Sequence, residues 1–221
     1  MNRKKEIISL AIAFLGAMLC LFGVVLFNKY ILMSLPLVLR MILMIVIYWI
    51  IAVIPFIIIL RDKKPLSDYG FFREHIFKQV IIGLILGLAM SLVFTLVPHL
   101  LGLGAYVDNG KRYQYLWQFI YEFVYCIIAV GFTEEFVFRG FLFTKCKSVF
   151  GTETAAMIGS SVLFGLFHVF SGNIGQMIIT GLLGALFCLF RMKIKNCSTV
   201  SLIFAHGIYD ALITVWTNCL S

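Results

Sequence analysis

The stretch from Ile7 to Phe27 reads IISLAIAFLGAMLCLFGVVLF and contains no charged residue. It is long enough to cross the hydrocarbon layer of a membrane as one helix, which takes about 20 residues. The basic residues before it look like the start of a signal peptide, but the apolar run is too long and no small-residue cleavage site follows cleanly. We therefore expect an uncleaved first membrane span.

Six further apolar runs follow along the chain. Their continuity favours helices over a membrane β-barrel, whose strands alternate apolar and polar residues over about ten positions. Of the 221 residues, 62% are hydrophobic and 13% are charged, which is far more apolar than a soluble domain. The expected fold is an all-α polytopic membrane protein with about seven transmembrane helices, near residues 7–27, 35–60 (interrupted by Pro55), 79–101, 116–143, 154–170, 174–190 and 199–216.

Basic residues are divided unevenly between alternate loops. Thirteen Lys and Arg residues fall in the N-terminal segment and every second loop, three fall in the other loops, and Arg40 and Arg139 lie within spans. The positive-inside rule therefore predicts an N-terminus inside and a C-terminus outside. By this interpretation the net charge of +8 reflects topology, and its dispersal over short loops argues against nucleic acid as a partner.

The chain has no linker, no repeat and no low-complexity segment, so we expect one membrane domain over residues 1–221. Its longest polar stretch, Arg61–Lys78, is expected to follow the cytoplasmic interface, with Tyr69, Phe71 and Phe72 in the headgroup layer. The six cysteines include no Cys-x-x-Cys pair. This spacing argues against a disulfide framework or a zinc knuckle.

Three of the expected spans carry ionisable residues, which are costly in a membrane and usually mark function. They lie in the segments TEEFVFRG (133–140), FGLFH (164–168) and HGIYD (206–210). Glu135 and Arg139 are four residues apart, so they share a helix face and are expected to pair. Glu134 points about 100° away and has no partner in its own helix, which suits a general base or acid.

The third motif follows the same geometry, because His206 and Asp210 also share a helix face and Asp210 can orient the imidazole. A rise of about 1.5 Å per residue puts Glu134 and His206 at a similar depth, roughly 14 Å from the inner ends of their spans, and His168 about 5 Å deeper. Each motif alone has a structural interpretation, as an ion pair, a packing histidine or an interhelical polar contact. Together, in so charge-poor a chain, they favour an active site. Three other ionisable residues near span ends are interpreted as interfacial: Glu122, His75 and His99.

The three motifs together resemble the signature of the CPBP intramembrane proteases, which include the type II CAAX prenyl endopeptidases and bacterial proteins linked to bacteriocin processing and self-immunity. The signature is Glu-Glu-x-x-x-Arg, then Phe-x-x-x-His, then His-x-x-x-Asn/Asp. This chain carries all three in that order, at Glu134–Arg139, Phe164–His168 and His206–Asp210. The resemblance covers about residues 116–216, the expected catalytic core. Asp210 stands where many relatives have Asn, and an ionised Asp cannot donate a hydrogen bond to an oxyanion.

The resemblance implies hydrolysis of a peptide bond by activated water within the membrane. The roles that it implies are water activation by Glu134, a shape-holding pair of Glu135 and Arg139, water positioning by His168, and water or oxyanion binding by His206 with Asp210 in support. It leaves open whether Zn²⁺ takes part. The zinc ligands would then be Glu134, His168 and His206, although no His-Glu-x-x-His pair lies on one helix.

The expected substrate is a membrane-associated peptide or protein precursor, met in the lipid bilayer of a bacterial cell membrane, and a prenylated CAAX substrate is the less favoured choice. Two other function classes stay open. A non-catalytic peptide-binding or bacteriocin self-immunity protein would keep its protective effect after Glu134→Ala. A transporter or channel would move charge across liposomes, but the sequence has no internal repeat and no matching pair of broken helices to support it.

Overall fold

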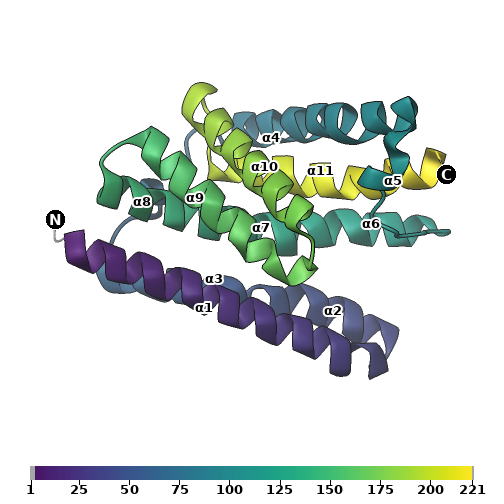
Figure 1. Cartoon of the computed structure of the whole chain (residues 1–221), viewed down its shortest axis with the longest axis horizontal. Coiled ribbons are helices and arrows are strands. Elements are labelled where there is room, and N and C mark those ends of the chain that lie inside the picture. The colour runs from purple at the N-terminus through teal and green to yellow at the C-terminus, as the bar shows by residue number, and fades with distance from the viewer. Residues whose placement is uncertain (1–2, 221) are drawn as a thin grey trace.

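A computed structural model of the chain describes residues 3–220. In this part of the chain the backbone forms helices and turns without a strand. Seven helical units are long and apolar enough to span a membrane: Arg3–Ser34, Leu37–Asp62, Ile76–Val107, Leu116–Phe150, Glu153–Ser171, Ile174–Lys193 and Thr199–Leu220. The expected all-α, seven-span architecture is confirmed. The two ends of the chain lie at opposite ends of the molecule (Figure 1), as an odd number of crossings requires, and the orientation in the membrane stays a prediction.

Several of these units join α-helical with π-helical or 3₁₀ segments. In chain order the elements are α1 (Arg3–Tyr30), η1 (Leu32–Ser34), α2 (Leu37–Tyr48), α3 (Ile50–Asp62), η2 (Leu66–Tyr69), α4 (Ile76–Ser91), η3 (Leu92–Leu96), η4 (His99–Leu103), α5 (Gly104–Val107), α6 (Leu116–Tyr125), η5 (Cys126–Gly131), α7 (Phe132–Glu135), η6 (Phe136–Leu142), α8 (Phe143–Phe150), α9 (Glu153–Phe167), η7 (His168–Ser171), α10 (Ile174–Lys193) and α11 (Thr199–Leu220). Segments η3, η4, η5 and η6 are π-helical, and η1, η2 and η7 are 3₁₀ turns.

The outward-facing side chains are large and apolar. Leu15 and Leu19 of α1 are 65% and 71% exposed, and Leu182 of α10 is 66% exposed. Water would penalise such a surface by an amount proportional to its apolar area, whereas hydrocarbon does not. The fold therefore belongs in a bilayer, and the protein is an integral multi-pass membrane protein.

The N-terminal helices α1, α2 and α3 form a hairpin along one side of the bundle (Figure 1). A buried ion cluster fastens this hairpin to the rest of the protein. Lys145 of α8 is 1% exposed, and its Nζ lies 2.8 Å from a carboxylate oxygen of Glu6 in α1 and 3.0 Å from one of Asp62 in α3. The hairpin is thereby held against the span that carries both glutamates of the first motif.

The second span is interrupted at Trp49, so the expectation of a break at Pro55 is wrong. Helix α3 continues through Pro55, and α2 ends at Tyr48. A proline removes a hydrogen bond to the carbonyl one turn earlier, and its ring presses against that turn, so the distortion lies on its N-terminal side. The indole Nε1 of Trp49 donates to the carbonyl of Ile128 at 2.8 Å, which holds the break beside the fourth span.

The loop between α3 and α4 folds into the protein. Tyr69 is 0% exposed and stacks on Phe141 with ring centroids 5.9 Å apart. The Tyr69 carbonyl accepts a hydrogen bond from Thr199 Oγ1 at 2.8 Å, and the Gly70 carbonyl accepts one from the Thr199 N–H at 3.0 Å. The expectation that Tyr69 lies in the headgroup layer is therefore wrong. An aromatic side chain in a polar loop can bury its ring in a protein core as well as at a membrane interface.

Helices α4 and α11 approach closely because α4 presents glycines to its partner. A Cβ atom on Gly83 would lie 2.4 Å from the carbonyl oxygen of Ser201. Gly83→Ala is therefore expected to force the two helices apart and destabilise the fold by about 1–3 kcal/mol. Thermal unfolding in detergent measures the effect. The matched control is Gly23→Ala in α1, where no heavy atom lies within 4 Å of the added Cβ. Equal melting temperatures of the two variants would contradict this account of the packing.

Candidate active site

The two adjacent glutamates lie in α7, a single turn of α-helix between the π-helical segments η5 and η6. A π-helical turn changes the regular i→i−4 hydrogen-bond pattern and is frequent at functional sites. In the fourth span, carbonyls of these segments accept hydrogen bonds from side chains of other helices. The carbonyl of Ile128 accepts from Trp49, that of Phe138 accepts from Ser160 Oγ at 2.7 Å, and that of Arg139 accepts from the guanidinium of Arg191. The helix bearing the first motif is thus anchored from the break between α2 and α3, from α9 and from α10.

Glu135 connects the first motif to the third. It is 0% exposed, and its Oε1 accepts a hydrogen bond from Arg139 Nη1 at 2.9 Å and lies 2.7 Å from His206 Nδ1. The predicted pairing of Glu135 with Arg139 is confirmed. Arg139 is 1% exposed and lies over the ring of Phe164, with its guanidinium carbon 4.0 Å from the ring centroid. The buried cation is therefore balanced by a carboxylate on one side and by an aromatic face on the other.

His206 of α11 lies among three carboxylates. Its Nδ1 faces Glu135, and its Nε2 lies 3.4 Å from Asp210 Oδ2 and 3.9 Å from Glu134 Oε2. The ring stacks on Phe187 with centroids 5.4 Å apart, which fixes its plane. His206 therefore has one nitrogen against Glu135 and presents the other towards Glu134 and Asp210.

Glu134 is 3% exposed and finds its partners on other helices, as its position on the helix predicts. Its Oε1 accepts a hydrogen bond from the hydroxyl of Tyr48 at the end of α2, and its Oε2 faces His206. The rise per residue predicted that Glu134 and His206 lie at a similar depth in the membrane, and in the structure the two side chains are 3.9 Å apart. It missed Tyr48, because helical spacing does not indicate which side chain of another helix will reach a site. The available signal was the hydroxyl group of Tyr48 in a span that carries few other polar groups.

His168 lies at the end of α9, where the helix gives way to the 3₁₀ turn η7. Its Nδ1 is 2.9 Å from the carbonyl of Phe164, which can only accept, so Nδ1 carries the proton and Nε2 is left as an acceptor. The ring packs edge-on against Phe164, which also contacts the ring of His206. Within residues 3–220, however, no hydrogen bond or ion pair joins His168 to Glu134 or to His206.

The zinc site that the sequence left open is not assembled by these side chains. In the described part of the chain, no three His, Cys, Asp or Glu residues are grouped so that they could hold a metal ion. Glu135 engages one nitrogen of His206, and His168 stands apart from Glu134. A zinc site needs three or four such atoms within about 2.3 Å of one point. The set of Glu134, His168 and His206 does not fit this requirement.

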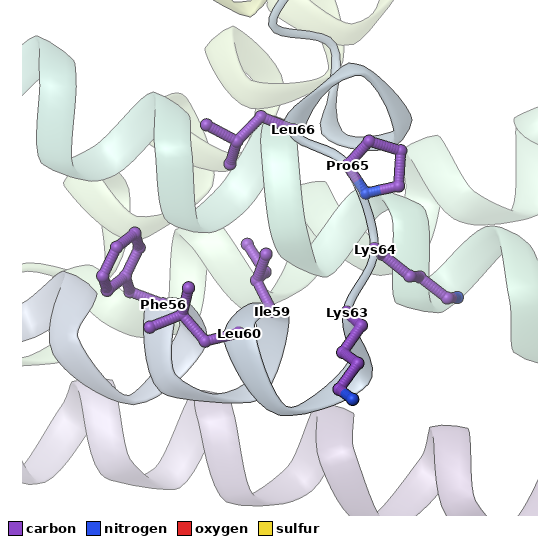
Figure 2. A pocket seen from close by; sticks show the side chains of 7 residues that line it. All are labelled: Phe56, Ile59, Leu60, Lys63, Lys64, Pro65 and Leu66. Atoms are coloured by element: carbon purple, nitrogen blue, oxygen red, sulfur yellow. The ribbon is translucent and has the colours of Figure 1, made fainter.

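Two adjoining apolar recesses open beside the glutamate-bearing helix, and we call them together the α3 groove. One has a volume of about 430 Å³ and is lined by Trp49, Ala52, Val53, Phe56, Leu66, Phe71, Phe132 and Phe136. The other, of about 490 Å³, is drawn in Figure 2 and is lined by Phe56, Ile59, Leu60, Lys63, Lys64, Pro65 and Leu66. They share Phe56 and Leu66, and the two lysines lie at the edge in Figure 2. The groove can therefore hold an apolar group next to the first motif.

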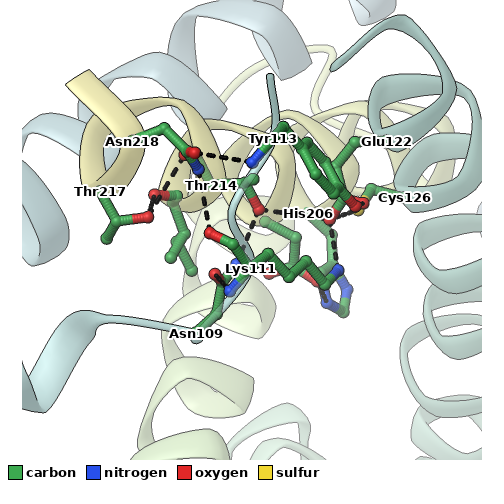
Figure 3. Close-up of polar contacts among 11 residues, drawn as sticks. Asn109, Lys111, Tyr113, Glu122, Cys126, His206, Thr214, Thr217 and Asn218 are labelled. Atoms are coloured by element: carbon green, nitrogen blue, oxygen red, sulfur yellow. Dashed lines mark hydrogen bonds and ion pairs between the residues drawn. The ribbon is translucent and has the colours of Figure 1, made fainter. Parts of the chain in front are cut away.

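A second polar cluster surrounds Glu122, which lies near the N-terminal end of the fourth span (Figure 3). Glu122 is 3% exposed, so it lies inside the protein. Its carboxylate accepts hydrogen bonds from Lys111 Nζ at 2.5 Å, from Tyr113 Oη at 2.7 Å and from Thr214 Oγ1 at 3.3 Å. Burial, together with this bond to Glu122, raises the pKa of Tyr113. The cluster fastens the loop between α5 and α6 to α11, and its contacts are accounted for by that structural role.

Comparison with known protein families gives a match for the segment that carries the motifs. Residues 116–212 match the family described as type II CAAX prenyl endopeptidase Rce1-like. No curated protein and no solved structure matches the chain. The matched segment begins with the fourth span and includes all three motifs, whereas Tyr48 and most of the α3 groove lie outside it.

Proposed function

Because residues 116–212 belong to the Rce1-like family of type II CAAX prenyl endopeptidases, within the CPBP proteases, we propose that this protein hydrolyses a peptide bond of a membrane-associated substrate. In this proposal Glu134 activates the attacking water. The family consists of intramembrane endopeptidases that act on membrane peptides or proteins.

One observation carries the proposal. Glu134 Oε2 and His206 Nε2 face each other at 3.9 Å, and both side chains are more than nine-tenths buried. A carboxylate base and an imidazole that can donate a hydrogen bond therefore border the same space, away from bulk water. Electrostatic interactions are stronger in such surroundings, and donors held in place need no rearrangement during the reaction.

In the proposed reaction Glu134 takes a proton from a water molecule as the water oxygen attacks the substrate carbonyl carbon. The new C–O bond pushes the carbonyl π electrons onto oxygen, and His206 donates a hydrogen bond to the resulting oxyanion. Glu134 then passes its proton to the amide nitrogen, and the C–N bond breaks as the oxyanion collapses. The products are a carboxylic acid and an amine, and Glu134 returns to its starting form.

The remaining motif residues support this pair. Glu135 engages Nδ1 of His206, and Arg139 offsets the charge of Glu135. The longer contact of Asp210 with Nε2, at 3.4 Å, gives way to the oxyanion as it forms. Until then Asp210 serves as an acceptor that orients His206, which answers the objection that an ionised Asp cannot donate to an oxyanion. The free Nε2 of His168 can accept a hydrogen bond from water approaching the site.

The α3 groove is the feature that suits the apolar part of a substrate. Aromatic rings of Phe132 and Phe136 line it, and these residues flank the two glutamates on the same helix. Phe132 and Phe136 share the face of this helix that points away from Glu134, so an apolar side chain or a lipid group in the groove would anchor a substrate whose backbone passes around the helix to reach Glu134. We therefore propose a peptide that carries a large apolar group.

The test is cleavage by the purified protein in liposomes. The substrates are membrane peptides in matched sets, with and without an isoprenoid on a C-terminal cysteine, and products are identified by mass spectrometry. We expect cleavage at a single position. A folded protein that binds these peptides and cleaves none of them would contradict the proposal and favour a non-catalytic binding protein.

A further inference from the structure

We propose that Tyr48 is a positioning residue for Glu134, supplied by the N-terminal helix hairpin from outside the segment that matches the protease family. This inference rests on the proposed function, since it assigns Tyr48 a part in the same reaction. It adds to the site a side chain that none of the three motifs contains.

The contact itself selects one oxygen of the catalytic carboxylate. Tyr48 donates its hydroxyl hydrogen to Oε1 of Glu134, while Oε2 is the oxygen that faces His206 Nε2 at 3.9 Å. A carboxylate attached through rotatable bonds can otherwise turn either oxygen towards the reacting water. With Oε1 held by Tyr48, Oε2 is left to take the proton, on the side where His206 meets the oxyanion.

The chemical type of Tyr48 fits this task. A phenol is a neutral donor at physiological pH, so it orients a carboxylate without adding a positive charge. A lysine or arginine in its place would pair with Glu134 and make the carboxylate a weaker base. Arg139 and His206 also lie at the site, and neither of them donates a hydrogen bond to Glu134 in the structure.

Two hydrogen bonds between the second and fourth spans, which we call the frame bonds, hold the backbone around Tyr48 in place. Tyr48 is the last residue of α2, and the adjacent Trp49 donates to the carbonyl of Ile128 at 2.8 Å. Earlier along α2, the Met41 carbonyl accepts a hydrogen bond from Tyr121 Oη at 2.9 Å. These bonds join α2 to the fourth span on both sides of the Tyr48 contact. The break in the second span thus lies directly beside the contact between Tyr48 and Glu134.

The test compares Tyr48→Phe with Tyr125→Phe. Tyr125 is a matched control because its ring packs edge-on against Tyr48, with centroids 6.4 Å apart, and its hydroxyl makes no hydrogen bond within the described residues. A hydrogen bond to a charged group is worth about 1.5–3 kcal/mol, so we expect kcat of Tyr48→Phe to fall about 10- to 100-fold. KM should stay within about twofold, because the lost bond orients the base and does not bind substrate.

The possible outcomes separate this inference from the proposed function. A wild-type protein that cleaves no peptide refutes the proposed function and this inference with it. An active wild type with an unchanged kcat in Tyr48→Phe, or with equal losses in both tyrosine variants, refutes the role of Tyr48 alone. Should Tyr48→Phe fail to fold, Tyr121→Phe carries the test, since it removes the frame bond to the Met41 carbonyl, keeps the phenol of Tyr48 and lies outside the α3 groove. We expect Tyr121→Phe to lower kcat a few-fold at constant KM, and an unchanged kcat would overturn the proposal.

Discussion

Glu134→Gln is expected to lower kcat by about 10²–10⁴-fold while KM changes little, the range that removal of a general base produces. The amide of glutamine is close in size to the carboxylate and still accepts the hydrogen bond from Tyr48, so the surroundings of the side chain are kept. It cannot take a proton from water, because an amide is hardly basic. Initial rates of peptide cleavage at saturating and at low substrate concentration separate the two kinetic constants.

The matched control for this variant is Glu122→Gln. Glu122 is also a glutamate of the fourth span and is also 3% exposed, but its partners are Lys111, Tyr113 and Thr214. We expect Glu122→Gln to cleave peptide at nearly the wild-type rate in its folded fraction. Comparable losses in the two variants would mean that any buried carboxylate of this span matters only for folding, and Glu134 would lose its catalytic assignment.

Arg139→Met is expected to destabilise the fold by about 3–5 kcal/mol and to abolish activity. Removing one member of a buried ion pair leaves the other charge without compensation, and Glu135 at 0% exposure has no access to solvent. The lost cation also vacates the face of Phe164. Because Glu135 orients His206 through the same oxygen, the site should be disordered together with the fold. Thermal unfolding in detergent and cleavage rate are measured on the same preparation.

Two further variants check this explanation. Arg112→Met removes an i,i+4 ion pair with Asp108 that has similar spacing but lies in an exposed loop. The guanidinium of Arg112 lowers the pKa of Asp108 to about 2, yet water screens the pair, so the melting temperature should hardly change. The double variant Glu135→Gln/Arg139→Met should recover part of the lost stability, because no unpaired charge stays buried. A stable Arg139→Met protein would contradict the account.

Much of the architecture is readable from local patterns. The seven spans follow from runs of apolar residues, since length and hydropathy decide whether a helix can cross a bilayer. The pairing of Glu135 with Arg139 follows from the pitch of a helix. The break in the second span was predicted at Pro55 and lies instead at Trp49, on the N-terminal side of the proline. A proline distorts the part of the helix that precedes it, because it removes a hydrogen bond to the carbonyl one turn earlier. Tyr69 was misplaced because composition does not tell a buried loop from an interfacial one.

The motifs of the sequence established the residue types of the candidate site, whereas tertiary structure alone decided how those residues meet. Spacing along one helix determines which side chains share a face, so the sequence could predict the face of Glu134 and the alignment of His206 with Asp210. Contacts between helices depend on crossing angles, π-helical turns and the packing of side chains, none of which a local pattern contains. For this reason only the folded chain shows that Glu135 joins Arg139 to His206, that His168 stands apart from Glu134, and that Tyr48 reaches Glu134 from a distant helix.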